Sequence, residues 1–284
     1  MKSNELFLLA ERFAPIRYSE EFCSRYGAYD NSGLLVDCGN DVKKAVFSLD
    51  LSCGTVEYAE KIGAKAIVTH HPAIYAKLSS LRADDPSSGA VLAAARAGIS
   101  VISMHLNLDA AEGGIDESLA EGIRKAAAKA HGASCDKAGG TEHGASRADE
   151  KIMYTFSCGK GGYGRVYDVT ETSAGKLKEA FDEEFSAKHT LLFGKENKAV
   201  RRAASFCGAG ADEEAIGFAA ENGADLIVSS DFKHHILKSA TERGMAVIAP
   251  THYASEAYGF YRFYQKIAGA AGIGCEFFAD ETLL

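Results

Sequence analysis

The sequence predicts an α/β protein built from two related α/β halves. Apolar runs of roughly four to six residues alternate with helical stretches of about ten residues, a pattern typical of parallel strands buried on both faces. One run, 63–69, is echoed by a second, 223–229, and the next apolar run in each copy ends in histidine. An internal repeat of this kind can decide an architecture that local propensities leave open.

The two copies of the repeat have the same order of elements. An amphipathic helix, at 55–62 or 212–222, ends at a glycine suited to a helix C-terminus, and a buried strand follows. A second helix and a second strand come next. Parallel sheets collect ligands beyond the carboxyl ends of their strands. The polar residues at those ends are His70, His71, His105, Asp231 and His252. A chance similarity between two ordinary βαβ units is the alternative explanation.

Residues 126–199 differ in character from both halves. The stretch 126–150 is rich in Ala, Gly, Ser and charged residues, which indicates a helix tail followed by a loop. After it we expect strands at 152–157, 165–169 and 190–193 and a helix at 174–185. We therefore predict that 1–125 and 200–284 are the repeated halves and that 126–199 is a smaller α/β insert.

Composition and charge narrow the class of protein. The chain has 284 residues, 46% of them hydrophobic, which is enough for a real core and argues against disorder. Its 31 Lys and Arg against 39 Asp and Glu give a formal net charge of −8, which argues against nucleic acid as a partner. No uninterrupted apolar run reaches about 18 residues, so we expect no membrane span and no signal peptide. The seven cysteines form no C-x-x-C pair, and we expect reduced thiols in a cytoplasmic protein.

Two adjacent histidines, His70 and His71, close a buried strand just before Pro72. Neighbouring side chains in a strand point to opposite faces, but the proline enforces a departure from the strand, so both rings can be aimed at one region. Neutral imidazole is the commonest side-chain metal ligand. For this pair alone, metal binding and ordinary hydrogen-bonded histidines both remain open.

Two further motifs have the form His-x-x-x-acid at equivalent points of the repeat. They are His105 with Asp109 and His252 with Glu256. If the chain enters a helix at each histidine, the imidazole and the carboxylate share a face and can meet one ion or two neighbouring ions. Two cations about 4 Å apart can clamp the attacking and leaving oxygens of a hydrolysis. Three such sets favour a metal site over strand-end histidines and helix-capping carboxylates.

Weaker motifs have plainer interpretations. The run 159–164 fits G-x-G-x-x-G, but a strand-like run follows it where a dinucleotide site needs a helix, so we expect a turn. Cys207 has no base beside it in the sequence, so we favour a buried thiol over a nucleophile. The aromatic run 253–264 is expected in the core or a subunit interface, with base stacking as the alternative. A basic group is expected to be solvated rather than bound to phosphate: Lys198, Arg201 and Arg202.

Taken together, these motifs resemble the Nif-three-like dinuclear metal family, whose members often carry the name GTP cyclohydrolase I type 2. The resemblance covers most of 26–126 and 200–262. The matching runs are 31–34, 48–50, 67–72, 105–115, 207–210, 223–225, 231–235 and 251–256. The family's usual Thr-Gly-Asp is Ser229-Ser230-Asp231 in this chain, and the insert matches only at 162–165.

The resemblance implies two interlinked α/β domains with the metal site in the cleft at the carboxyl ends of the strands. It also implies cyclic homo-oligomers, often toroidal hexamers. The positions that match the family's ligands to two metal ions are His70, His71, Asp109, His252 and Glu256, of which the glutamate can bridge. His105 matches a group beside the metals or an occasional ligand. Asp50, Asp231 and His235 match positions near the cleft.

We therefore expect a dinuclear metal-dependent hydrolase that acts on a nucleotide or phosphoester. Ligation by imidazole and carboxylate without thiolate suits zinc, iron or manganese, with two divalent ions per subunit. In a GTP cyclohydrolase reaction, water activated by the metals would attack the imidazole carbon of the base, and His105 or His235 would relay protons. The alternative is a metal-stabilised regulatory protein that binds a protein or nucleic acid without turnover.

Overall fold

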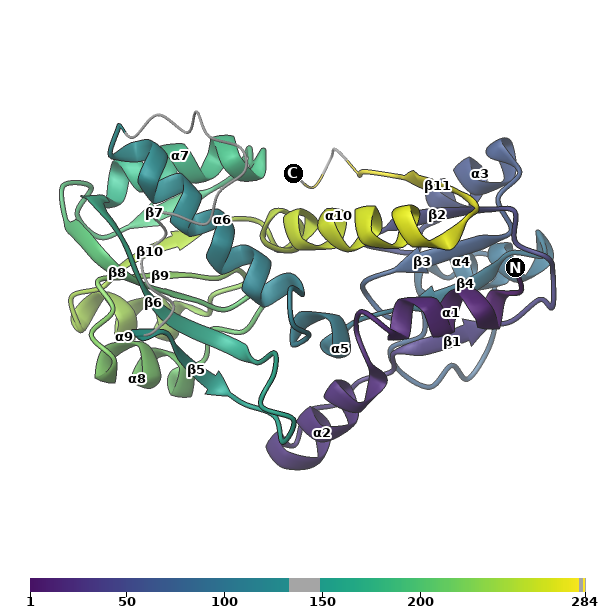
Figure 1. Cartoon of the computed structure of the whole chain (residues 1–284), viewed down its shortest axis with the longest axis horizontal. Coiled ribbons are helices and arrows are strands. Elements are labelled where there is room, and N and C mark those ends of the chain that lie inside the picture. The colour runs from purple at the N-terminus through teal and green to yellow at the C-terminus, as the bar shows by residue number, and fades with distance from the viewer. Residues whose placement is uncertain (133–148, 281–282, 284) are drawn as a thin grey trace. The chain divides into compact units, whose positions relative to one another are not determined.

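The computed structural model describes residues 1–132, 149–280 and 283, and these residues form two compact units. The first unit comprises Met1–Gly114 and Phe260–Glu281, and the second comprises Ile115–Gly259 and Thr282–Leu284. Each unit holds one mixed β-sheet and its own helices (Figure 1). The boundary inside the last helix, α10 (His252–Ala271), assigns its beginning to the second unit and its remainder to the first.

The sheet of the first unit has the strand order β1-β4-β3-β2-β11. Its strands are β1 (Gly33–Val36), β2 (Lys44–Ser48), β3 (Ala66–Thr69), β4 (Ser100–Ser103) and β11 (Gly274–Phe277). Four are mutually parallel, and β1 runs antiparallel to β4. Helices α3 and α4 connect the parallel strands β2, β3 and β4. The helices of this unit before α10 are α1 (Ser3–Glu11), α2 (Ile16–Tyr26), α3 (Cys53–Ile62), α4 (Pro86–Arg96) and α5 (Leu106–Asp109).

The sheet of the second unit has the strand order β5-β6-β8-β9-β10-β7. Its strands are β5 (Lys151–Tyr154), β6 (Tyr163–Ser173), β7 (Leu191–Phe193), β8 (Ala199–Ser205), β9 (Leu226–Val228) and β10 (Ala246–Ala249). Strands β8, β9 and β10 are parallel and are connected by helices, as β2, β3 and β4 are in the first unit. The helices before α10 are α6 (Ile115–Ala130), α7 (Ala174–Phe185), α8 (Glu213–Glu221) and α9 (His234–Glu242).

The segment 126–199 does not form a layer of its own in the described residues. Its strands β6 and β7 flank the parallel strands β8, β9 and β10 within one sheet, each pairing antiparallel with its neighbour. The structural division therefore differs from the predicted boundaries at 125 and 200. Strand order depends on pairing between distant segments, which local periodicity does not encode. Residues 133–148, most of the predicted loop, lie outside the described residues.

The glycine-rich run 159–164 joins two antiparallel strands. Tyr154 at the end of β5 pairs with Tyr163 at the start of β6. Gly159, Gly161 and Gly162 between or beside them all have positive φ angles, which glycine adopts without a Cβ penalty. The run therefore enters a strand rather than a helix, as the turn interpretation predicts.

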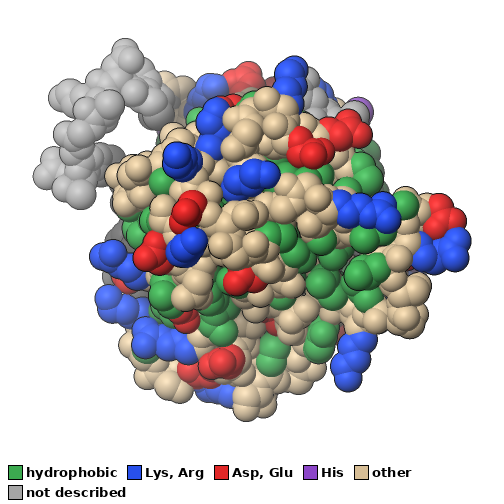
Figure 2. Space-filling view, turned by 90° about the vertical axis from the view of Figure 1, so that its right-hand side faces the viewer, with side chains coloured by type: hydrophobic (Ala, Val, Ile, Leu, Met, Phe, Trp, Pro, Cys, Tyr) green, Lys and Arg blue, Asp and Glu red, His purple; other side chains and the backbone are tan. Residues whose placement is uncertain are grey.

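The face of the molecule shown in Figure 2 carries mixed charge. Figure 2 shows Lys and Arg side chains interspersed with Asp and Glu over the face that it presents. Such mixing gives no extended area of one sign for a polyanion on that face. No helix in the described part of the chain combines the length and the apolar character needed to cross a bilayer.

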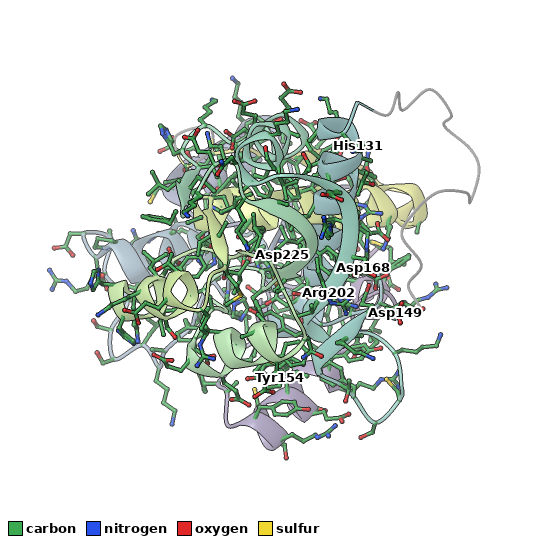
Figure 3. All side chains as sticks on the ribbon, turned by 90° about the vertical axis from the view of Figure 1, so that its left-hand side faces the viewer. His131, Asp149, Tyr154, Asp168, Arg202 and Asp225 are labelled. Carbon is green, nitrogen blue, oxygen red and sulfur yellow. The ribbon has the colours of Figure 1, made fainter. Side chains whose placement is uncertain are left out.

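The basic group at the start of β8 is paired with acidic side chains. The guanidinium of Arg202 donates to a carboxylate oxygen of Asp168 and, over 2.8 Å, to the carbonyl of Asn222 (Figure 3). Its backbone amide donates to Asp225 over 3.2 Å. Arg201 pairs with Glu171 at 3.0 Å. These contacts favour a structural role for the group over phosphate binding.

A buried ion cluster ties α6 to the sheet of the second unit. Arg165 on β6 is 3% exposed and donates to Asp116 on α6 over 2.8 Å and to Glu150 over 2.5 Å. Burial lowers the pKa of Arg165 by itself, but the two carboxylates outweigh it and raise that pKa. Removal of one member of such a buried ion cluster strongly destabilises the fold, because the opposite charge is then buried without its partner.

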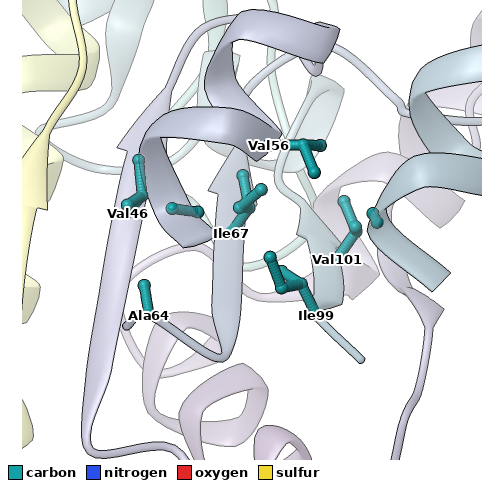
Figure 4. Close-up of a cluster of buried hydrophobic side chains, with 8 residues drawn as sticks. Val46, Val56, Ala64, Ile67, Ile99 and Val101 are labelled. Carbon is teal, nitrogen blue, oxygen red and sulfur yellow. The ribbon is translucent and has the colours of Figure 1, made fainter. Parts of the chain in front are cut away.

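The apolar core of the first unit includes a cluster between the parallel strands and helices α3 and α4. Figure 4 shows its eight residues. They are Val46, Val56, Ala59, Ala64, Ile67, Ala94, Ile99 and Val101, none more than 2% exposed. Full burial of a Val or Ile side chain contributes about 1.5–3 kcal/mol. The strands therefore read as apolar runs without alternation because both of their faces are covered.

The aromatic run of α10 belongs mainly to cores. Phe260, Phe263 and Tyr264 surround Phe47 of β2, with ring centroids 6.4, 6.4 and 5.4 Å away. Tyr253 is 4% exposed in the second unit. Packing within the subunit therefore accounts for these four aromatic residues without base stacking.

Candidate metal centre

The adjacent histidines follow strand β3, and their rings lie close together. The amides of His70 and His71 donate to the same carbonyl oxygen, that of Leu49, over 3.1 and 2.9 Å. Consecutive amides of a continuing strand point in opposite directions, so this shared acceptor marks the end of the extended backbone. The two ring centroids lie 4.9 Å apart, and His70 is fully buried.

His105 and Asp109 lie one helical turn apart. His105 precedes the short helix α5, and its carbonyl accepts the amide of Asp109 over 2.9 Å. Asp109 is 4% exposed, and its carboxylate Oδ1 lies 3.5 Å from Nε2 of His70. One ligand atom from each of His70, His105 and Asp109 lies within 4.8 Å of the other two. The first unit thus gathers a group that could hold a metal ion, and His105 lies in that group as a ligand or beside the ion.

All three imidazoles of the first unit are held through Nδ1 by an oxygen acceptor. The pairs are His70 with the Met104 carbonyl at 2.8 Å, His71 with Asp50 Oδ1 at 2.7 Å, and His105 with Asp30 Oδ1 at 2.8 Å. Because a carbonyl or carboxylate accepts, Nδ1 is the donor in each pair, and the neutral ring then presents a lone pair at Nε2. Histidines that bind metals are oriented by such contacts of their other nitrogen.

Asp30, which orients His105, was not among the residues selected from the sequence. Burial by itself raises its pKa, but hydrogen bonds from His105, Ser19 and Ser32 together lower that pKa to about 2. Its position follows from the sheet: β1 runs antiparallel to β4, so residues that precede Gly33 lie beside residues that follow β4. The polar residues just before β1 were the feature of the sequence that could have pointed to Asp30.

The second unit holds the other predicted pair, His252 and Glu256, on the first turn and a half of α10. Nε2 of His252 lies 3.1 Å from Oε1 of Glu256, which is 3% exposed. Nδ1 of His252 lies 2.5 Å from Oδ2 of Asp231, so this imidazole too is oriented by a carboxylate. The described structure therefore shows the same arrangement in both units: Nδ1 held by oxygen and Nε2 facing a carboxylate.

Gly208 lies directly against this pair. A Cβ at this position would lie 2.3 Å from Oε1 of Glu256 and 3.2 Å from Nε2 of His252, and the φ of +58° also favours glycine. Its carbonyl accepts the amide and the hydroxyl of Ser230, over 2.9 and 2.7 Å, and the hydroxyl of Ser229, over 3.0 Å. The Ser229-Ser230 variation on the family's Thr-Gly thus supports the turn while Asp231 still reaches His252.

The loop that contains Gly208 is also held by a tyrosine at the start of β6. The Tyr163 hydroxyl donates to the carbonyl of Cys207 over 2.7 Å. A Cβ at position 210 would lie only 1.8 Å from that hydroxyl, so Gly210 makes room for it. Cys207 itself is 2% exposed, which agrees with a buried strand-end thiol.

His235, the other predicted catalytic residue, lies exposed in the first turn of α9. It lines a cavity of about 580 Å³ in the second unit together with Asp231, the residue that orients His252. The remaining lining residues include Lys233 and, from the first turn of α8, Glu213 and Glu214. A small molecule in this cavity could therefore contact His235 beside the support of His252.

Comparisons with known proteins found a matching family model and named relatives. A family model described as Duf34/NIF3 (NGG1p interacting factor 3) matches residues 1–282. A protein of Clostridium perfringens named GTP cyclohydrolase 1 type 2 homolog is 27% identical over 260 residues, covering 90% of this chain and 87% of the relative. A Methanocaldococcus jannaschii protein with the same name is 28% identical, covering 94% and 95%.

Solved structures support the same fold. A Bacillus cereus protein described as related to NIF3 superposes with a TM-score of 0.74 at 19% identity, covering 98% of this chain and 96% of that one. A protein from Thermus thermophilus superposes with a TM-score of 0.69 at 18% identity, covering 98% and 97%. At these identities the likeness concerns the fold alone.

Proposed function

Since the chain belongs to the Duf34/NIF3 family, we propose that it is a divalent-metal-binding hydrolase that acts on a nucleotide or phosphoester. The observation that carries the proposal is the orientation of four imidazoles, each held through Nδ1 by oxygen. They are His70, His71, His105 and His252. Two units with this pattern, each with a buried carboxylate facing Nε2, offer the donor chemistry that zinc, iron and manganese accept.

We assign the ligands of two cations per subunit to residues of both units. They are His70, His71, Asp109, His252 and Glu256, with the glutamate in the bridging role that the family resemblance implies. A single dinuclear centre requires that the two ligand sets serve the same ions. The similar order of parallel strands and helices in both units is consistent with an origin by internal repetition, which would also explain two similar ligand sets.

Bound cations would supply Lewis-acid activation of a water molecule and of a substrate oxygen. The protein's own residues would hold the ligands in place and move protons. His105 suits proton transfer because Asp30 holds its Nδ1–H, and one ligand atom of its ring lies within 4.8 Å of those of His70 and Asp109. His235 is the second proton-transfer candidate because it lines a cavity beside Asp231. The names of the relatives make guanine nucleotides the first substrates to assay.

Metal analysis of purified protein tests the binding part of this proposal. We expect two divalent ions per subunit in wild type and loss of both in His70→Ala and in Glu256→Ala, although the changed residues belong to different units. His131→Ala is the control, since this exposed histidine contacts the Glu171 carbonyl instead of the site. Loss of metal in only one of the two variants would contradict a shared centre, and full retention in both would contradict the assignment.

A turnover assay tests the catalytic part. Metal-loaded wild type and His252→Ala would be incubated with a panel of nucleotides and phosphoesters, and product release would be followed. Turnover that His252→Ala abolishes supports the enzyme. His235→Ala is expected to lower kcat by about 10²–10⁴ with its metal retained, as loss of a general acid or base does. Metal binding without turnover on any compound would favour the regulatory, non-catalytic alternative.

We also propose a cytoplasmic homo-oligomer, a toroidal hexamer by family resemblance. The cysteines of the described residues are all free thiols, as expected in a reducing compartment, while Cys135 lies outside the described residues. Light scattering coupled to size-exclusion chromatography measures the oligomer directly.

A further inference from the structure

Two exposed tyrosines of the first unit contact each other beside the metal-ligand group. Tyr29 is 54% exposed and Tyr75 is 52% exposed, although large aromatic side chains are normally covered. Their ring centroids lie 5.3 Å apart with an interplanar angle of 90°. Two aromatic surfaces are therefore presented together to solvent, and neither is needed to cover the apolar cluster of this unit.

The tyrosine pair is connected to His105 by direct contact and by sequence. The ring of Tyr75 lies 6.4 Å from that of His105, edge to face at 89°. Tyr29 immediately precedes Asp30, whose carboxylate holds Nδ1 of His105. The pair therefore borders the imidazole whose ligand atom groups with those of His70 and Asp109.

The backbone that carries the two tyrosines is fixed by a cross-link between their loops. Asn31, two residues after Tyr29, donates through its side-chain amide to the carbonyl of Ile74 over 2.5 Å. Ile74 immediately precedes Tyr75, so this bond links the two loops close to both aromatic residues. Asp30 is anchored in addition by the hydroxyl of Ser32 at 2.6 Å. Loops that are linked before binding lose less conformational entropy when a ligand binds.

We propose that the Tyr29–Tyr75 pair binds the planar base of a nucleotide whose phosphate or ring oxygen reaches the metal-ligand group. This inference rests on the proposed metal-dependent function and narrows its substrate class from phosphoesters in general to nucleotides. A base has an aromatic face that stacks on a tyrosine ring, whereas an aliphatic phosphoester has none. Stacking does not read hydrogen-bonding edges, so this pair by itself accepts adenine as readily as guanine.

Calorimetric titration of the metal-loaded protein tests the proposal with three probes: guanosine monophosphate, adenosine monophosphate and glycerol 3-phosphate. Because the two rings are perpendicular, a planar base can lie parallel to only one of them. We expect whichever of Tyr75→Ala and Tyr29→Ala removes that ring to weaken both nucleotides about tenfold, the order that loss of one base–aromatic stack produces, and the other variant to weaken them less. Affinity for glycerol 3-phosphate and metal content should not change. Tyr75→Phe keeps the ring and should bind as wild type does. Leu81→Ala is the matched control, because Leu81 is equally exposed, at 54%.

The outcomes separate this proposal from the proposed function. Equal weakening of all three probes, unchanged nucleotide affinity in both tyrosine variants, or absence of nucleotide binding by wild type would overturn base stacking at this pair. Tyrosine-dependent nucleotide binding without any turnover would support the pair and contradict the hydrolase. Turnover of nucleotides that neither tyrosine variant changes would support the hydrolase and contradict the pair.

Discussion

Replacement of Gly208 by alanine is the most direct test of how the second unit positions its proposed metal ligands. The added Cβ would lie 2.3 Å from Oε1 of Glu256, and real Cβ contacts essentially never fall below 3.0 Å. The carboxylate oxygen must therefore move by about 0.7 Å, or the Gly208 backbone must move instead. The backbone has little freedom, because its carbonyl accepts three hydrogen bonds from Ser229 and Ser230.

The expected size of the effect follows from two contributions. Alanine at a φ of +58° costs about 1–2 kcal/mol of folding stability. Displacement of a carboxylate ligand adds a loss of metal affinity, and changes that disturb ligand orientation typically cost about 10–100-fold. We therefore expect Gly208→Ala to remain folded and to bind metal at least about tenfold more weakly.

The assay is a competitive titration with a coloured chelator, combined with urea unfolding of the metal-free protein. Gly223→Ala is the matched control in the same unit, since its φ is +73° and a Cβ there meets nothing within 4 Å. Both variants should lose similar stability, but only Gly208→Ala should lose metal affinity. Equal metal affinity in the two variants would refute the assignment of Glu256 as a ligand held against Gly208.

Three further predictions concern the groups around the ligands. Asp231→Asn removes the anion that orients His252 and should weaken metal binding about 10–100-fold; an unchanged dissociation constant would contradict this role. The pKa of Asp30 is about 2 in the folded chain against 3.8 unperturbed. The ionised Asp30 therefore contributes its full share to the free energy of unfolding above about pH 4, and this contribution is lost as the pH falls toward 2. Its replacement by Asn should therefore cost metal-free protein about 2 kcal/mol at neutral pH, and urea midpoints that stay equal at pH 7 would refute this. Arg165→Met leaves Asp116 buried without its cation, so the free energy of unfolding should fall by about 3–5 kcal/mol, and a loss below about 1 kcal/mol would show that the cluster relaxes.

Local sequence pattern determined the identity of most strands and of the candidate ligands. The apolar runs that end at Thr69 and Ser103 are buried strands because residues covered on both faces leave no alternation. The i,i+4 spacing in His105-x-x-x-Asp109 and His252-x-x-x-Glu256 predicted a shared helical face, and the chain is helical from 106 and from 252.

Tertiary structure alone decided which strands share a sheet and where the units divide. Residues 126–199 have the periodicity of a separate α/β segment, yet β6 and β7 pair with β8 and β10. The continuous helical pattern of α10 gives no sign that Phe260 begins the part assigned to the first unit. Both outcomes depend on pairing and packing between distant residues, and periodicity reports only the environment of each residue's own neighbourhood.

The residues that hold the candidate ligands in place also could be found only from the tertiary structure. The candidate ligands could be selected from the sequence because imidazole and carboxylate recur at strand ends, where parallel sheets bind ligands. The roles of Asp30, which orients His105, and of Gly208, which lies against Glu256, could not be predicted in the same way. Asp30 reaches His105 only because β1 pairs antiparallel with β4, and Gly208 matters only because folding brings Glu256 against it. The sequence by itself determined which groups are candidates for binding a cation, whereas the fold decided what holds them, since that depends on contacts between residues far apart in the chain.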